Sequence, residues 1–213
     1  MFAVRHGRVE ADLMMNSLDS NLFFVRERPG MLRLVNDFDV IDPATGQPVM
    51  HCREEPPRGV HRLLRYSALL RRTTPFDIRV QMPEGGQVLR MKRGVPVIAS
   101  EIQVFDGAGV LIGLFRQKPI SMSGAFDVLD AARQPVCRLV GARAGWNFRF
   151  MAPGDIEVGR VTKKWGGLGK ELFSSASDYV LQIDEVVPAD SLIRRLIFAS
   201  ALCVGVVQKI DIP

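Results

Sequence analysis

The sequence has few cysteines, and their spacing excludes the usual cysteine-based sites. Cys52, Cys137 and Cys203 are an odd number of thiols spread over 213 residues, and no CxxC pair occurs. Structural zinc sites and dithiol redox motifs need closely spaced pairs, so the sequence predicts neither. We therefore expect three reduced thiols that are mostly buried.

No hydrophobic run is as long as a membrane-spanning helix. The most apolar stretch is DSLIRRLIFASALCVGVVQKI, in which residues 196–207 are twelve consecutive uncharged positions. A spanning helix needs about 20 apolar residues, whereas runs of about 10–14 are typical of buried core helices. Asp190 and Ser191 are good N-cap residues, and the following side chains are apolar on every face. Residues 190–209 are therefore predicted to form a helix that is surrounded on every face by protein or by lipid, and its short apolar length favours protein.

Signals for export, metal binding and catalysis are also missing. The first twenty residues contain no continuous apolar stretch of the kind found in signal peptides, so a cytoplasmic protein is expected. His6, His51 and His61 form no HxH or HxxxH pair, and no GxSxG elbow occurs. The stretch GGLGKE, residues 166–171, lacks the first glycine and the Ser or Thr of a phosphate-binding loop. The sequence therefore does not predict an enzyme.

Alternation of apolar and polar residues, interrupted by turns rich in Asp, Gly or Pro, recurs along the chain and is typical of β-hairpins. It predicts two flanking strands, within 20–35 and 178–187, and five hairpins that begin at Asn36, Pro75, Glu101, Ala125 and Asn147. About twelve strands in series predict an antiparallel meander that closes into a barrel, because closure removes exposed edges. Such a barrel is wider than its own side chains fill, so the helix 190–209 is predicted to thread it. We expect a short N-terminal arm, 1–19, and a single domain, 20–213.

Positive charge is concentrated in one part of the chain. Between Arg58 and Arg93 there are nine basic and two acidic residues, whereas the remainder has 19 basic and 21 acidic residues. Within this part, PPRGVHRLLRYSALLRR, residues 56–72, has helical periodicity with arginines opposite an apolar side. It is predicted to be a basic amphipathic helix. Such a helix either lies on an anionic bilayer or packs on the barrel with its arginines in water.

One stretch carries a specific pattern, GRVTKKWGGLGKELFSSASDYVLQI, which begins at Gly159. It resembles the signature of the phospholipid scramblase family at ten positions in order and without gaps: Gly159, Thr162, Lys163, Trp165, Gly167, Lys170, Glu171, Phe173, Ala176 and Tyr179. RRTTPFDIRV, GVLIGLF and the closing hydrophobic helix follow the order of that family, and the similarity extends from about Ser20 to Val207. The resemblance implies a mainly β, tubby-like fold: a closed twelve-stranded barrel around a hydrophobic C-terminal helix.

The resemblance also implies a lipid-linked role. Scramblases and the related tubby and LURP-one-like proteins are associated with calcium-activated phospholipid movement, with phosphoinositide binding, or with no established activity. Scramblases carry an acidic calcium loop before the last helix, whereas this chain has Ser175 and Ser177 there, which leaves Asp178, Asp184 and Glu185. Calcium takes six to eight oxygen ligands, so the sequence argues against calcium control and predicts no cofactor. The cysteine-rich segment and proline-rich tail of animal members are absent, and the basic helix stands in place of the cysteines.

Three functions remain open. The first is a scramblase-like protein that binds anionic phospholipid at the cytoplasmic membrane surface, with a peripheral place on the inner face of the plasma membrane. Surface binding is expected more than phospholipid movement, because a helix inside the barrel offers no spanning element. The second is a soluble interaction module for a protein partner or a small apolar ligand. The third, nucleic-acid binding, is the weakest, because the basic part contains only Tyr66 and Phe76 for stacking on bases.

For the lipid-binding function, the sequence offers two basic patches. The contacts of the first are expected from the predicted helix and the residues after it, namely Arg58, Arg62, Arg65, Arg71 and Arg72. Those of the second are expected from the scramblase-like stretch, namely Lys163, Lys164, Trp165 and Lys170. Trp165 has two interpretations: an anchor at the membrane interface, or a cap that packs near Ile193.

Overall fold

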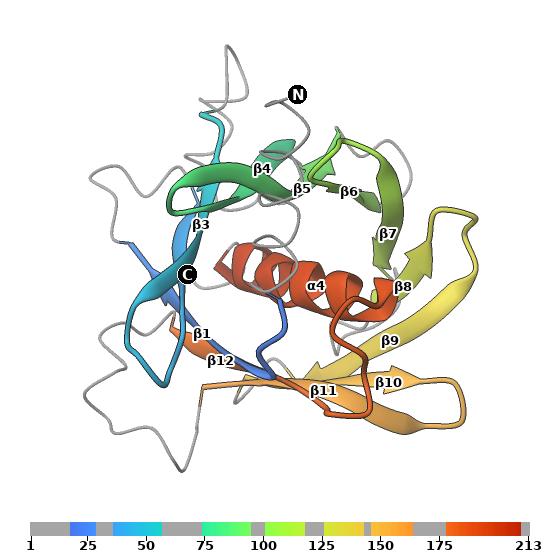
Figure 1. Ribbon diagram of the computed structural model, residues 1–213. Helices are drawn as coiled ribbons and strands as arrows, with labels where there is room; N and C mark the ends of the chain where they lie inside the picture. The colour runs from blue at the N-terminus through green and yellow to red at the C-terminus, as the bar shows by residue number, and fades with distance from the viewer. Residues whose placement is uncertain are drawn as a thin grey trace, which may run out of the picture.

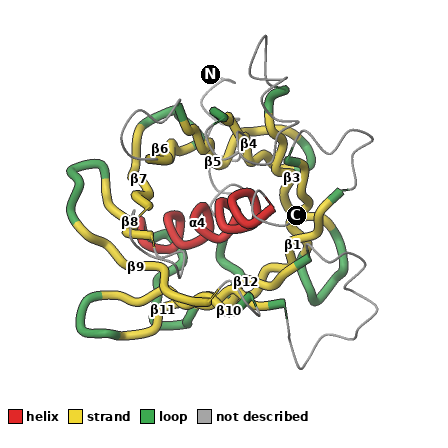
Figure 2. Tube along the Cα trace, turned by 180° about the vertical axis from the view of Figure 1, so that it is seen from behind, coloured by secondary structure: helices red, strands yellow, loops and turns green. Residues whose placement is uncertain are grey.

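The computed structural model describes residues 18–28, 36–56, 74–94, 101–117, 126–142, 146–163 and 178–209. In these residues, twelve antiparallel strands close into a barrel around one helix (Figures 1 and 2). Each strand pairs with the next one in sequence, and β1 closes the barrel against β12. The predicted barrel around a C-terminal helix is therefore confirmed.

The strand bounds follow the predicted alternation. The first six strands are β1 (Leu22–Glu27), β2 (Asp37–Ile41), β3 (Pro48–Glu54), β4 (Phe76–Met82), β5 (Gly85–Arg93) and β6 (Glu101–Asp106). The other six are β7 (Leu111–Gln117), β8 (Phe126–Asp130), β9 (Pro135–Ala142), β10 (Asn147–Ala152), β11 (Ile156–Thr162) and β12 (Tyr179–Ile183). All five predicted hairpins and both flanking strands are present.

The helix α4 (Leu192–Lys209) fills the lumen, as Figure 1 shows. Successive strand residues point to opposite sides of a sheet, so each strand sends alternate apolar side chains inward against α4. The Phe23 and Phe198 rings, for example, meet edge to face with their centroids 5.1 Å apart. No helix among the described residues is both long and apolar enough for a membrane crossing.

Two glycines allow α4 to approach the barrel wall closely. A Cβ atom on Gly113 of β7 would lie 2.7 Å from Cδ2 of Leu196 and 2.5 Å from a backbone oxygen. On the helix itself, a Cβ atom on Gly205 would lie 2.8 Å from the hydroxyl of Tyr179, which donates a hydrogen bond to the Ala201 carbonyl at 3.1 Å. These contacts fix both the depth and the rotation of the helix, because no side chain fits at either position without displacement.

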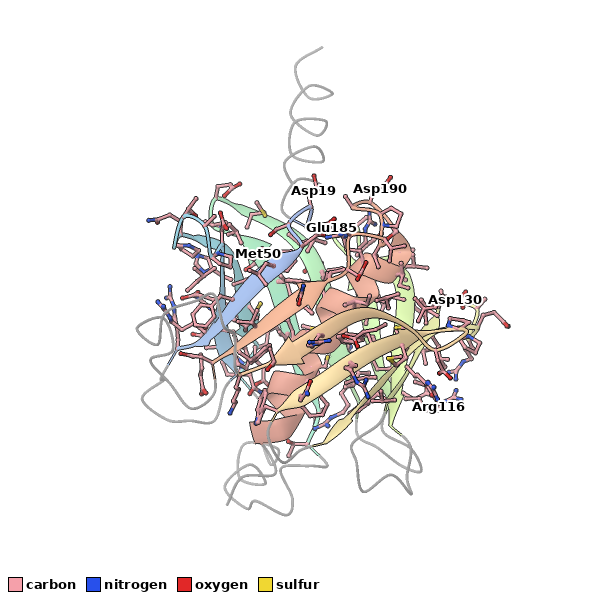
Figure 3. All side chains as sticks on the ribbon, turned by 90° about the horizontal axis from the view of Figure 1, so that it is seen from below. Asp19, Met50, Arg116, Asp130, Glu185 and Asp190 are labelled. Atoms are coloured by element: carbon pink, nitrogen blue, oxygen red, sulfur yellow. The ribbon has the colours of Figure 1, made fainter. Side chains whose placement is uncertain are left out.

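The strands alternate in direction, so their connections alternate between the two ends of the barrel. We call the end where α4 begins the entry end; Figure 3 shows Asp19, Glu185 and Asp190 gathered there. We call the opposite end the exit end. The last turns of α4 lie toward it, because Gly205 contacts Tyr179, the first residue of β12. The connections β1–β2, β3–β4, β5–β6, β7–β8, β9–β10 and β11–β12 all lie at the exit end.

Arg194 anchors the start of α4. Its side chain is 2% exposed, and it donates hydrogen bonds of 2.7–3.2 Å to five oxygens, those of Leu18, Ser20, Asn21 (Oδ1), Val187 and Pro188. Burial lowers the pKa of Arg194, and the charge of Asp19 opposes that shift. Ser191, predicted as a cap, accepts the backbone N–H of Arg194 at 3.3 Å. The guanidinium thereby ties the helix to the residues just before β1.

Candidate functional site

The strand ends that flank both predicted basic patches lie at the exit end. The described residues that flank the first patch are Glu54, the last residue of β3, and Phe76, the first of β4. Those that flank the second are Thr162, the last residue of β11, and Tyr179. Around the barrel, β3 and β12 are separated only by β2 and β1. At about 4.8 Å per strand interval, β3 and β12 are roughly 14 Å apart around the barrel.

The two ends of the barrel carry opposite charge in their connections. The six exit-end connections, 28–36, 55–75, 94–100, 118–125, 143–146 and 163–178, contain twelve basic and three acidic residues. The six at the entry end, 42–47, 83–84, 107–110, 131–134, 153–155 and 184–191, contain one basic and six acidic residues. By sequence, the connections between exit-end strand termini thus have a net charge of +9, and those between entry-end strand termini have a net charge of −5.

Buried charged groups line the inner rim of the exit end. Glu54 accepts hydrogen bonds from the backbone N–H and side-chain amide of Asn36, at 2.8 and 2.7 Å. The Arg93 guanidinium donates to the carbonyl of Thr74 at 2.8 Å and lies 4.7 Å from the centroid of the Phe76 ring. These contacts fix residues at which the chain enters β2 and β4.

A second rim cluster surrounds Trp146. This residue has a left-handed backbone with φ 48°, and its ring packs 5.5 Å from that of Tyr179. The Lys163 ammonium lies 4.0 Å from the centroid of the Trp146 ring, a cation–π contact. Burial lowers the pKa of Lys163, while the charges of Asp178 and Glu27 oppose the shift. Through Tyr179 and its bond to the Ala201 carbonyl, the cluster links the start of the second patch to α4.

Of the residues predicted to bind lipid, Lys163 is described by the structure, and its ammonium group is directed at Trp146 rather than held wholly in solvent. Arg58, Arg62, Arg65, Arg71, Arg72, Lys164, Trp165 and Lys170 lie outside the described residues. So do the predicted basic helix, apart from its first residue, Pro56, and most of the N-terminal arm. Their contacts with lipid, and both interpretations of Trp165, therefore stay predictions.

The carboxylates considered for calcium are distributed over both ends of β12. Asp178 precedes the strand at the exit end, is 1% exposed, and accepts the backbone N–H of Glu27 at 3.1 Å. Asp184 and Glu185 follow the strand at the entry end. Six residues of extended strand separate Asp178 from Asp184 by roughly 20 Å, so the two carboxylates are too far apart to bind one ion. Among the described residues, no group of three His, Cys, Asp or Glu side chains could hold a metal ion.

The three thiols are free and buried, as the sequence predicted. Burial raises the pKa of Cys137 to about 12, and it also raises the pKa values of Cys52 and Cys203. The Cys203 sulfur lies 3.5 Å from the sulfur of Met91 inside the barrel. Because the thiolate is the reactive form, these cysteines pack in the core rather than serve as nucleophiles.

Sequence reasoning missed Trp146, Arg194 and the outward-facing arginines Arg149 and Arg160. The last two lie directly opposite each other on β10 and β11. Alternation within each strand could have placed both on the outer surface, but the sequence does not show the register that pairs them. Trp146 gives no periodic signal, because it lies in a connection rather than in a strand.

Comparison with known proteins agrees with the scramblase-like pattern. A family model described as Scramblase matches residues 34–207. Human phospholipid scramblase 2 is 26% identical over 125 residues, which cover 52% of this chain and 42% of that protein. The chain thus spans less than half the length of this curated relative. No solved structure gives a significant match. Because the family model covers most of the chain, the protein belongs to the scramblase family.

Proposed function

We propose that the protein binds anionic phospholipid at a membrane surface through the exit end of its barrel. The observation that carries this proposal is the charge separation between the two ends, +9 and −5 in their connections. Membership of the scramblase family supports a lipid-related role, and the relative's name refers to phospholipid. The inner face of the plasma membrane, which is rich in anionic lipid, is the surface that this charge fits.

The charge separation would also orient the molecule. Each Lys or Arg near an anionic surface contributes about 1 kcal/mol, so the five arginines of the first patch alone would hold the protein at low salt. The acidic entry end would be repelled from the same surface and would face the cytoplasm. Salt weakens the attraction between exposed charges and the membrane, and at 0.1 M this attraction is largely lost beyond a Debye length of about 10 Å. Binding would therefore weaken as ionic strength rises.

Phospholipid movement across the bilayer is the finer part of the proposal and is secondary to surface binding. In the structure, α4 lies inside the barrel with its apolar residues buried by strands. A mechanism of movement by one chain would have to act through the bound surface, by disturbing the lipid packing beneath the exit end. A dye-reduction assay on labelled liposomes measures such movement once binding is established.

The alternative is a soluble module that binds a protein partner or a small apolar ligand. An apolar crevice against α4 has a volume of about 10 Å³ and is lined by Phe115, Phe126, Leu139, Ser200, Cys203 and Val204. Ligand pockets usually measure about 300–1,000 Å³, so this crevice does not favour a small-molecule ligand. A protein partner would be indicated by binding that survives high salt.

The test is co-sedimentation with phosphatidylcholine liposomes, with and without phosphatidylserine, at low and high salt. Replacing Arg62 and Arg65 by Gln should weaken binding to the acidic liposomes about 30-fold, because two contacts of about 1 kcal/mol are lost. The matched control, Arg138→Gln with Arg195→Gln, removes the same charge from the entry-end side, where Arg138 pairs with Asp155 and Arg195 lies in the first turn of α4, and should bind as wild type. Failure of the wild type to sediment with acidic liposomes at low salt would refute the proposal, as would equal losses in both double variants.

A further inference from the structure

Two arginines face each other on the outer wall of the barrel. In the pairing of β10 with β11, Arg149 lies directly opposite Arg160, and both side chains are exposed. Directly opposed residues on one sheet face have Cβ atoms about 4.5–5.5 Å apart, and like charges in this position destabilise a sheet. The pair is therefore an unfavourable arrangement for an isolated barrel.

The surrounding charges relieve this repulsion only in part. Glu157 accepts two N–H groups of Arg160, at 2.9 and 2.8 Å, on one of its carboxylate oxygens. A guanidinium has five N–H donors, so three of Arg160 remain for another acceptor. Among the described residues, no carboxylate forms an ion pair with Arg149; Asp155 pairs instead with Arg138 on β9. The net charge of Arg149, Arg160 and Glu157 is thus positive.

Neighbouring positions add further hydrogen-bonding groups. Gln182 of β12 lies opposite Arg160. Asn147 lies two residues before Arg149 on β10, toward the exit end and on the same face of the sheet. Both side chains are exposed amides. The ladder of β10 and β11 has an irregularity between Phe150 and Met151, next to Arg149, and such bulges increase the local twist and redirect side chains. The four side chains form one polar surface on three adjacent strands.

We propose that Arg149 and Arg160 together bind a phosphate monoester, presented by a lipid headgroup on the membrane. Glu157 offsets one of the two guanidinium charges and leaves a net charge of +1, which attracts a phosphate dianion, and the N–H groups that Glu157 does not occupy can donate to the phosphate oxygens. The pair lies two residues from the exit ends of β10 and β11, about 7 Å along the strands. The inference rests on the proposed function, in which the exit end faces the bilayer. Binding of a headgroup by Arg149 and Arg160 would also bring the outer side of β10 and β11 to that bilayer, so the barrel axis would be tilted from the membrane normal.

The test compares liposomes of phosphatidylcholine with phosphatidylserine or with phosphatidic acid, whose headgroup is a phosphate monoester, mixed to equal surface potential. Wild type should bind the phosphatidic acid liposomes at least fivefold more tightly, since one extra arginine contact corresponds to about that factor. Arg149→Gln with Arg160→Gln should lose this preference but keep salt-sensitive binding to phosphatidylserine. Arg138→Gln, on the same wall, should keep the preference. If inorganic phosphate, but not chloride at equal ionic strength, displaces wild type from phosphatidic acid liposomes, the phosphate group alone is recognised. If inorganic phosphate does not displace it and the double variant still loses the preference, recognition requires the membrane-bound headgroup.

The outcomes separate this inference from the function on which it rests. No sedimentation of wild type with either acidic liposome would refute the proposed function. Equal binding of both lipids by wild type, or a preference that survives in the double variant, would refute the phosphate site alone. A stability measurement provides a second readout: Arg149→Gln should raise the apparent Tm in the absence of lipid by about 1–2 °C, because it removes the like-charge pair. A lower Tm would show that Arg149 has a structural role and would overturn the inference.

Discussion

Replacement of Arg194 by Met should strongly destabilise the barrel, although it makes the helix more apolar. The guanidinium donates five hydrogen bonds to oxygens before β1 and before α4. Each such bond contributes about 0.5–1.5 kcal/mol net, and thus about 5 kcal/mol together. Methionine avoids the desolvation of a charge, and water at the entry end satisfies the outermost acceptors. We therefore expect a net loss of about 3 kcal/mol, a large part of the 5–15 kcal/mol typical of a domain.

The measurement is urea unfolding followed by tryptophan fluorescence, with wild type, Arg194→Met, Arg194→Lys and Arg195→Met. The lysine variant keeps the charge but has three donors, so it should lose about half as much as the methionine variant. Arg195, the next residue in the helix, is less buried and is the matched control, expected to lie within about 0.5 kcal/mol of wild type. If the free energies of unfolding of Arg194→Met and Arg195→Met agree within 1 kcal/mol, the anchoring role of Arg194 is wrong.

Two further variants test the packing and the charge network. Gly205→Ala should destabilise the protein by about 1–3 kcal/mol in thermal unfolding, although alanine has the better helix propensity, because the new methyl group meets the Tyr179 hydroxyl. Adding Tyr179→Phe should restore part of this loss. No loss in Gly205→Ala, or no restoration by Tyr179→Phe, would contradict this packing. Burial alone would raise the pKa of Asp39, but hydrogen bonds from His51 and Arg28 and nearby arginine charges hold it below 3.8. Because the folded-state pKa of Asp39 is lowered, its contribution to stability is present at neutral pH and is lost as pH falls below about 3.8. In urea unfolding, Asp39→Asn should therefore be less stable than wild type at pH 7 and lose less further stability below about pH 4. The same loss of stability in both proteins over that acid range would refute this.

The strands and the helix could be predicted because each has a local signal. Alternation of apolar and polar residues, interrupted by turn residues, predicted the hairpins. Twelve consecutive uncharged residues, apolar on every face of a helix, predicted a helix with no side exposed to water. Closure of the barrel followed from the number of strands and the cost of exposed edges. The bounds differ by only a few residues, as with α4, which begins at Leu192 rather than at Asp190.

The contacts that carry specificity could not be predicted, because they depend on register and on residues distant in sequence. Arg194 donates a hydrogen bond to Leu18, which is 176 residues away in the sequence. In the sequence alone, Arg194 is visible only as a charged residue that interrupts the apolar run. Arg149 and Arg160 are opposed because of one register among several possible ones. That the strand ends flanking both basic patches lie at one end of the barrel follows only from the closed strand order, since the two segments are far apart in sequence.

The position of α4 also has a consequence for synthesis of the protein on the ribosome. The five hairpins are local and can pair as they emerge, but β1 must wait for β12, with Leu22 opposite Gln182, and the lumen stays unfilled until α4 follows. At about 5–20 residues per second, the inner apolar faces of the early strands remain uncovered for roughly 10–40 s. During that time the nascent sheet exposes the surface that chaperones recognise, so the cell must protect the unfinished barrel until its last element arrives.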